Sequence, residues 1–259
     1  MTLRALLAAD ALPLGHMIFE FATPGIGYLV KQAGADFMLF DLEHSGFSFE
    51  TAKHVVNSAR AAGLPIVIRV PSRDAKDLAR AADIGADGVM APNVGSAAEA
   101  RAIVAALKYP PDGMRGVGQV QMHDRYRIGA FADKARAEND ANAVILQIES
   151  REGAADADAI AAVRGVDCLW VGHMDLSCSL GTPGRFDTPE FAAAVKAVLD
   201  ATKRHRVRAG RMARNVEEAA TLAAEGFDCL ALAADTSLYQ TALSQGLAAV
   251  REKTKGIRR

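Results

Sequence analysis

Short runs of apolar residues recur along the chain, and each is followed by a longer segment in which the apolar residues have helical spacing. The runs are continuous rather than alternating, which is typical of parallel strands covered on both faces. The longer segments are amphipathic and rich in alanine, as in FETAKHVVNSARAAG at 49–63. The eight predicted strands lie at 14–21, 36–42, 65–70, 87–92, 143–149, 166–172, 206–212 and 227–233.

Eight alternating strand and helix units without a break in composition predict a single (β/α)₈ barrel domain over residues 1–259. The alternative is an open, doubly wound sheet. Residues 237–253 are predicted to form a C-terminal helix, which is the eighth helix of the barrel. The stretch at about 93–142 is longer than a plain connection and contains a predicted polar helix, DKARAENDAN. We expect it to form an extended loop, rather than a second domain, at the rim over the site.

Composition and charge exclude several classes of partner. The 259 residues are 50% apolar and 24% charged, as in an ordinary folded protein. Thirty basic and 31 acidic side chains give a net charge of -1, so we expect no nucleic acid and no membrane partner. The sequence has no apolar stretch of 18 residues and no signal peptide pattern at its start, which predicts a cytoplasmic protein.

Polar residues stand at the end of nearly every predicted strand. In a barrel of this type the carboxyl ends of the strands meet at one mouth, where the chemistry is done. The sequence therefore predicts a polar ring around that mouth. Its members are Asp41, Glu43, His44, Arg69, Asn93, Gln147, Glu149, His173, Asp175, Arg211 and Asp235.

Two of these residues, Glu149 and Asp175, are carboxylates at the ends of neighbouring strands. Adjacent buried carboxylates repel, and a divalent cation removes the repulsion. Two carboxylates with the remaining ligand positions open to water and substrate suit Mg²⁺ or Mn²⁺. Alternatively, Glu149 caps a helix or pairs with Arg151.

Arg69 and His44 are the other candidates for chemistry. Arg69 ends the apolar run PIVIRV, and its guanidinium suits a carboxylate or an enolate oxygen. Its alternative role is a salt bridge to one of the nearby acids. His44 ends a strand beside the turn at Ser45 and Gly46, so it is a candidate for proton transfer, with a hydrogen-bonded loop histidine as the alternative.

Other reaction types lack the residues that they need. None of the nine lysines lies inside a predicted strand, whereas a Schiff-base aldolase requires a desolvated lysine in the barrel. The sequence contains neither a Gly-x-Ser-x-Gly nucleophile motif nor a GxxxxGK[ST] phosphate loop. Hydrolase triads and nucleotide chemistry therefore have no support.

Several motifs together resemble the HpcH/HpaI class II 2-oxo-acid aldolases, which belong to the pyruvate/phosphoenolpyruvate-binding superfamily of TIM barrels. The resemblance covers roughly residues 3–245. It is carried by FDLEHSGFS, the arginine of VIRVP, DIGADGVMAPNVGSAAEAR, YPPDGMRGVG, QIESREG and VGHMDLSCSLG.

This resemblance implies a role for each candidate residue. It implies that Glu149 and Asp175 bind a divalent metal ion, Mg²⁺ or Mn²⁺ with Co²⁺ also possible. Substrate binding is assigned to Arg69, Gln147, Asp175 and the backbone amide of Met174, and proton transfer to His44 with Asp41 nearby. The resemblance also implies that Asp83 partners the histidine. Asp83 lies away from the expected mouth, and it acts either in its own subunit or from a neighbouring one, since members of the family are homo-hexamers built as trimers of dimers.

The implied reaction is the reversible cleavage of a 4-hydroxy-2-oxo acid into pyruvate, or hydroxypyruvate, and an aldehyde. The alternatives are a citrate-lyase-type acyl-CoA lyase and a non-catalytic barrel that binds 2-oxo acids. Many relatives have Gly-Pro-Ala-Asp-Leu-Ser where 172–177 read Gly-His-Met-Asp-Leu-Ser, so we expect the bulk of His173 and Met174 to reshape the pocket. The candidate pocket walls are Ile18, Phe19, Met174 and Met212.

Overall fold

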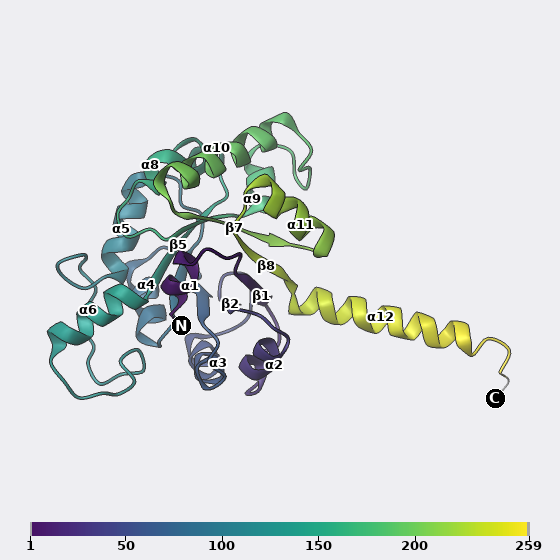
Figure 1. Cartoon of the computed structure of the whole chain (residues 1–259), viewed down its shortest axis with the longest axis horizontal. Coiled ribbons are helices and arrows are strands. Elements are labelled where there is room, and N and C mark those ends of the chain that lie inside the picture. Colours follow the sequence, from purple (N-terminus) through teal and green to yellow (C-terminus); the bar gives the residue numbers. More distant parts are fainter. Residues whose placement is uncertain (1, 258–259) are drawn as a thin grey trace.

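The computed structural model describes residues 2–257, which form a closed barrel of eight parallel strands in chain order (Figure 1). Each strand pairs with the next, and β8 pairs with β1. The predicted barrel is confirmed, and all eight predicted strands are present. They are β1 Leu14–Ile18, β2 Phe37–Asp41, β3 Ile66–Arg69, β4 Gly88–Ala91, β5 Ala143–Ile148, β6 Cys168–Val171, β7 Arg208–Ala213 and β8 Cys229–Ala234.

Helices connect the strands on the outside of the barrel. Side-chain caps start several of them, as where Ser48 accepts a hydrogen bond from the backbone N–H of Thr51. The helices are α1 Leu3–Ala8, α2 Ile26–Gln32, α3 Phe49–Ala61, α4 Ala75–Asp83, α5 Ala97–Leu107, α6 Phe131–Ala141, α7 Arg151–Ala155, α8 Ala157–Ala161, α9 His173–Ser179, α10 Pro189–His205, α11 Val216–Glu225 and α12 Asp235–Lys253.

The long connection at 93–142 contains the polar helix that was predicted in it. Its irregular part lies beside the end of α4, where the backbone N–H of His123 donates to the carbonyl oxygen of Asp83 at 3.3 Å. Helices α5 and α6 occupy its two ends, and the irregular part is limited to residues 108–130. Within residues 2–257, no helix is both long enough and apolar enough to cross a membrane.

Apolar side chains form two layers. Alternate residues of each strand point into the barrel, where Phe37, Leu39, Val67 and Trp170 pack together. The residues between them point outward and pack against the helices, as Phe40 and Ile68 do. Because the strands from β2 to β7 are packed on both faces in this way, the polar residues at their ends have fixed positions.

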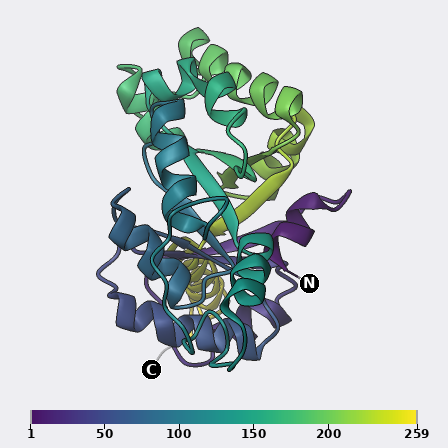
Figure 2. The same ribbon diagram turned by 90° about the vertical axis from the view of Figure 1, so that its left-hand side faces the viewer.

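Helix α12 does not cover the barrel. It begins at Asp235, directly after β8, and extends away from the body of the protein (Figure 1). In the view turned by 90°, α12 lies behind the barrel and is seen nearly end-on (Figure 2). Every residue from Ser237 to Lys253 is exposed. The predicted C-terminal helix is therefore present, but it does not take the outer position that an eighth barrel helix would have.

Candidate active site

The carboxyl ends of β2 and β3 bring Asp41 and Arg69 together. Asp41 is fully buried, and Arg69 Nε donates to its Oδ1 at 2.6 Å. The Asp41 carboxylate also accepts the backbone N–H groups of Glu43 and His44 at 3.1 and 2.8 Å. Its role is therefore to hold the turn after β2 and to orient the guanidinium, and both predicted residues lie at the mouth.

The guanidinium of Arg69 retains an unused donor. Its Nη1 donates to Gln147 Oε1 at 3.5 Å, and Nε lies 3.3 Å from Glu43 Oε2. Nη2 is buried and has no hydrogen-bond partner within residues 2–257. A buried donor without an acceptor costs about 1–3 kcal/mol. This N–H is thus suited to an oxygen of a bound ligand.

Glu149 lies at the end of β5 and is nearly buried, with 5% of its surface exposed. Its Oε2 accepts a hydrogen bond from Gln147 Nε2, and its Oε1 accepts the backbone N–H of Asn93 at 2.6 Å. A Cβ atom on Gly172 would lie 2.2 Å from Glu149 Oε2. Glycine at 172 therefore leaves the space that the carboxylate occupies.

Three carboxylates influence one another at this mouth. Burial raises the pKa of Glu149 from its ordinary 4.5 to about 7, and the carboxylates of Glu43 and Asp175 act in the same direction. Burial also raises the pKa of Glu43, where Asp41 and Asp175 add to the effect and Arg69 opposes it. Negative charge is thus concentrated where Asp175 stands in the first turn of α9.

The chemistry of these residues fits a divalent cation that keeps water or substrate ligands. Carboxylate oxygens are the ligands that Mg²⁺ and Mn²⁺ prefer. Glu43 Oε2 is buried and has no hydrogen-bond partner in the described part of the chain. Among residues 2–257, no three His, Cys, Asp or Glu side chains form a complete metal cage. Glu149 and Asp175, whose charges influence each other, fit an open site in which they would be the protein ligands and the remaining positions would be left to water or substrate.

His44 stands at the edge of this cluster, and 56% of its side chain is exposed. Its Nε2 lies 3.7 Å from Glu43 Oε2, while its backbone N–H bonds to Asp41. Asp83 is not brought to it. Asp83 ends α4, at the opposite end of the barrel from the mouth, and pairs with Arg115 at 2.6 Å.

Two residues that were expected in the polar ring face elsewhere. Arg211 points out of the barrel, because it shares the outward parity of Ala209 and Ala213 in β7. It is buried among phenylalanine rings about 6 Å away and lies 3.7 Å from Glu218. His173 is 7% exposed and packs edge-on against Phe186, and burial, with Arg211 nearby, lowers its pKa to about 4.

The predicted pocket walls divide in a similar way. Ile18 is fully buried in the outer core and does not line the mouth. Phe19 and Met212 pack against the cluster inside the barrel, and the ring centre of Phe19 lies 5.8 Å from Arg69 Cζ. Met174 is 51% exposed on the first turn of α9. The large side chain of His173 is thus buried in the core, and the large side chain of Met174 is exposed.

The sequence placed Glu43 and Asn93 in the polar ring, but it did not predict the contact of Glu43 with Arg69 or the hydrogen bond from the backbone of Asn93 to Glu149. Glu43 was visible in the motif FDLEHSGFS, but its contact with Arg69 depends on the turn after β2. Asn93 has a φ of 49°, in the left-handed region that asparagine tolerates, and its backbone N–H donates to Glu149 Oε1. A cavity of about 530 Å³ lies between these two residues and Arg73.

Comparisons with known proteins show which family this chain resembles. The sequence model of the HpcH/HpaI aldolase/citrate lyase family matches residues 22–242. The chain is 31% identical to a 2-dehydro-3,6-dideoxy-6-sulfogluconate aldolase of Pseudomonas putida, with 95% of each protein covered. It is 35% identical to a hydroxypyruvate/pyruvate aldolase of Paraburkholderia phytofirmans, over 92% of this chain and 94% of that one.

A solved structure is similar over the whole fold. The crystal structure of an HpcH/HpaI aldolase from Desulfitobacterium hafniense superposes with a TM-score of 0.91 at 32% identity, and the match covers 97% of each chain.

Proposed function

Because this chain belongs to the HpcH/HpaI aldolase/citrate lyase family and is a carbon–carbon lyase of the aldolase type, we propose that it cleaves 4-hydroxy-2-oxo acids reversibly. The products would be pyruvate, or hydroxypyruvate, and an aldehyde. The observation that carries the proposal is the buried chain of side chains from Asp41 through Arg69 and Gln147 to Glu149, which ends in a cluster of carboxylates.

In the proposed reaction the bond between C3 and C4 breaks, and the hydroxyl on C4 loses its proton. The electron pair of the broken bond becomes the enolate of the 2-oxo acid, which later takes a proton at C3. Arg69 would bind the oxygen on which negative charge develops, through the Nη2 donor that has no hydrogen-bond partner among residues 2–257. Gln147 would orient the same substrate oxygens from the neighbouring strand.

We propose that Glu149 and Asp175 hold a divalent ion, Mg²⁺ or Mn²⁺, with Co²⁺ as a further possibility. Bound there, the ion would polarise the 2-oxo group and stabilise negative charge, a contribution of several kcal/mol. The raised pKa of Glu149 supports this assignment, because a cation would stabilise the ionised carboxylate against burial first and against the charges of Glu43 and Asp175 second.

His44 would accept the proton of the C4 hydroxyl through a water molecule and return it in the synthetic direction. Its exposure and its contact with Glu43 support this role. A contribution of Asp83 would require a neighbouring subunit, because Asp83 pairs with Arg115 in its own chain. We therefore propose a homo-oligomer, with a hexamer as the expected form.

The reaction is tested by measuring pyruvate release from 4-hydroxy-2-oxo acids with added Mn²⁺ and in EDTA. Asp175→Asn should abolish the metal-dependent rate, and Asp187→Asn, whose side chain is 81% exposed, is the matched control. Full activity in EDTA after exhaustive dialysis would rule out the metal-dependent mechanism. Heat released on titration with coenzyme A would favour an acyl-CoA lyase, and binding of 2-oxo acids without turnover would indicate a non-catalytic barrel.

The role of His44 has a separate test. Decarboxylation of oxaloacetate passes through the same enolate but needs no proton removed from a hydroxyl group. His44→Ala should therefore lower aldol cleavage by about 10²- to 10⁴-fold and leave decarboxylation largely intact. Wild-type aldol turnover in this variant would remove His44 from proton transfer.

A further inference from the structure

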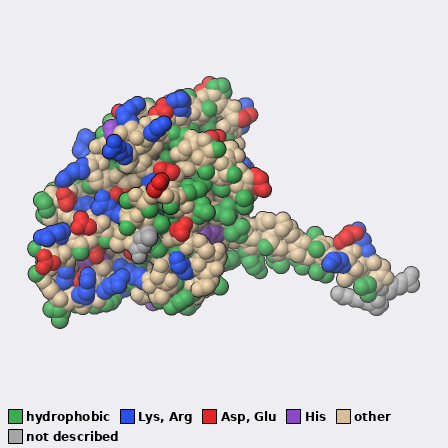
Figure 3. Space-filling model, viewed as in Figure 1, with side chains coloured by type: hydrophobic (Ala, Val, Ile, Leu, Met, Phe, Trp, Pro, Cys, Tyr) green, Lys and Arg blue, Asp and Glu red, His purple; other side chains and the backbone are tan. Residues whose placement is uncertain are grey.

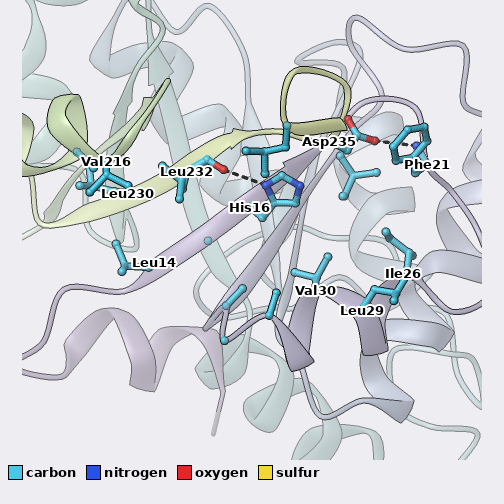
Figure 4. A pocket seen from close by; sticks show the side chains of 17 residues that line it. Leu14, His16, Phe21, Ile26, Leu29, Val30, Val216, Leu230, Leu232 and Asp235 are labelled. Atoms are coloured by element: carbon cyan, nitrogen blue, oxygen red, sulfur yellow. Dashed lines mark hydrogen bonds between the residues drawn. The ribbon is translucent and has the colours of Figure 1, made fainter. Parts of the chain in front are cut away.

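Two cavities on the outside of the barrel differ in the polar groups that they offer to a ligand. The larger is an apolar groove of about 500 Å³, with β1 and β8 as its floor and α2 and α11 as its sides (Figure 4). Its two ionisable side chains already have partners. His16 Nδ1 bonds to Leu232 O at 2.9 Å, and the Asp235 carboxylate accepts the backbone N–H groups of residues 19–21 at 3.0, 2.9 and 2.7 Å. Neither side chain is therefore left to bind a polar ligand.

The second cavity, of about 400 Å³, lies between α10 and α11. Both helices pack on β7 at one side of the barrel (Figure 1). In the space-filling view, charged side chains lie over α10 and α11, whereas hydrophobic side chains gather at the root of α12 (Figure 3). Sites for small molecules have volumes of about 300–1,000 Å³, so this cavity is large enough for an organic molecule. Its apolar walls are formed by Phe186, Phe191, Val195, Leu199 and Leu222.

A buried guanidinium lines this cavity from β7, and we call the cavity the Arg211 cavity. Arg211 is 5% exposed. Its Nε has no hydrogen-bond partner within residues 2–257, and its Nη2 lies 3.7 Å from Glu218 Oε1, which is beyond the length of a hydrogen bond. The other two buried arginines in this part of the chain, Arg69 and Arg115, each contact an aspartate at 2.6 Å. Arg211 thus lacks the close partner that a buried charge needs.

The acidic side chains at the Arg211 cavity do not supply this partner. Glu218 Oε2 accepts hydrogen bonds from Arg214 Nε at 2.9 Å and from the backbone N–H of Arg214 at 2.8 Å, so one carboxylate serves two guanidinium groups. Burial lowers the pKa of Arg211, while Glu218 and then Glu225 oppose this effect. One further negative charge therefore fits beside Arg211.

Aromatic rings hold the guanidinium without using its N–H groups. The ring centres of Phe186, Phe191 and Phe227 lie 5.9, 5.8 and 5.8 Å from Arg211 Cζ. Such contacts are made through the faces of the rings and leave the donors of the guanidinium unpaired. A ligand that satisfies these donors must bring an acceptor into an apolar setting, and an apolar body attached to that acceptor would be buried against the same walls.

We propose that the Arg211 cavity binds a small carboxylate that carries an apolar chain or ring. The carboxylate would accept two parallel hydrogen bonds from the guanidinium, whose fork matches its geometry. The apolar body would lie against Val195, Leu199 and Leu222. The two glutamates of the lining disfavour a doubly charged anion such as phosphate. Because Arg211 points away from the barrel mouth, the inference does not depend on the reaction that the mouth catalyses.

The test measures the binding of radiolabelled phenylacetate by equilibrium dialysis in EDTA, which keeps metal ions out of the mouth. Ala192→Trp closes the cavity, because Ala192 is exposed, lines the cavity and lies on the same face of α10 as Val195 and Leu199. The control, Ala193→Trp, places the same side chain on the next exposed residue, which does not line the cavity. Arg211→Met removes the guanidinium and keeps an apolar side chain among the rings. Circular dichroism verifies that each variant is folded.

We expect the wild type and Ala193→Trp to bind phenylacetate with the same Kd. Ala192→Trp and Arg211→Met should each raise this Kd by at least about tenfold, the factor that hydrogen bonds to a charged group contribute. Phenylacetamide, which has the same ring and no charge, should compete at least about tenfold more weakly than unlabelled phenylacetate.

The proposal is overturned if the wild type shows no saturable binding at millimolar phenylacetate, or if binding is unchanged in Ala192→Trp or in Arg211→Met. An equal loss in Ala193→Trp would also overturn it, because the substitutions would then act through the helix and not through the cavity. Displacement of phenylacetate by phosphate at lower concentrations than by unlabelled phenylacetate would assign the cavity to an inorganic anion instead.

Discussion

Replacement of Glu149 by glutamine should change how the stability of the metal-free protein depends on pH. The carboxyl group has a pKa of about 7 in the folded protein and an ordinary value of 4.5. Between these values the folded state holds a proton that the unfolded state has lost, so stability falls as pH rises through this range. At about 1.36 kcal/mol for each pKa unit, the total loss is about 3 kcal/mol. Glutamine keeps the shape of the side chain and removes this titration.

The measurement is equilibrium urea unfolding at pH 4.5, 6, 7 and 8 in EDTA, at one protein concentration. Far-ultraviolet circular dichroism and the fluorescence of Trp170, the single tryptophan, should give coincident transitions. The free energy of unfolding of Glu149→Gln minus that of the wild type should rise by about 3 kcal/mol from pH 4.5 to pH 8. Addition of Mn²⁺ at pH 8 should stabilise the wild type and leave the variant nearly unchanged.

Parallel pH profiles for the two proteins would refute the reasoning. They would mean that Glu149 is not held in a desolvated cluster with Glu43 and Asp175, and the electrostatic argument for a cation at this mouth would lose its basis. A difference that appears only above pH 8 would have to be assigned to another group.

Three further predictions concern single side chains. Arg69→Lys should lower kcat/KM for the 2-oxo acid by at least about 100-fold in steady-state assays, because an ammonium group cannot pair with a carboxylate and also offer the planar second donor. Gly172→Ala should weaken Mn²⁺ binding, measured by calorimetry, by at least about tenfold. The new Cβ would lie only 2.2 Å from Glu149 Oε2 and would push this oxygen out of place. The control Gly246→Ala, on α12, puts its Cβ in open space and should bind Mn²⁺ normally. Burial lowers the pKa of Lys108 from 10.5 to about 8, so between pH 8 and pH 10.5 the unfolded state binds more protons than the folded state. In urea unfolding, the free energy of unfolding of the wild type minus that of Lys108→Met should therefore rise by about 3 kcal/mol over this range. A difference that does not change with pH would contradict the shift.

The barrel was predictable because a parallel strand that is buried on both faces is apolar at consecutive positions. Runs such as PIVIRV and AVILQIE are apolar at consecutive positions, and each gave a strand within the predicted range. The position of α12 was not predictable in this way. Its apolar face indicates that the helix needs a partner surface, but the sequence does not say which surface that is.

The position of a candidate site residue was predictable where the residue stands at the carboxyl end of a strand and its side chain points into the barrel mouth, as for Asp41, Arg69 and Glu149. The prediction that Arg211 lies in the polar ring was wrong, because a position near the end of a strand does not fix which face of the sheet a side chain takes. The alternation of β7, with Met212 inside the barrel, puts its neighbour Arg211 outside. The part played by Glu43 depends on a turn whose path is fixed by the hydrogen bonds to Asp41, and such tertiary contacts leave no pattern in the sequence.

The junction at Asp235 couples the C-terminal helix mechanically to the segment at 19–21. Helix α12 is about 28 Å long, and its pivot is a carboxylate that also grips the backbone at 19–21. A load on the far end, such as an affinity tag or a surface linkage, exerts torque on the segment that carries Phe19. An affinity tag or surface linkage at the far end of α12 is therefore a poor choice for assays of the catalytic rate.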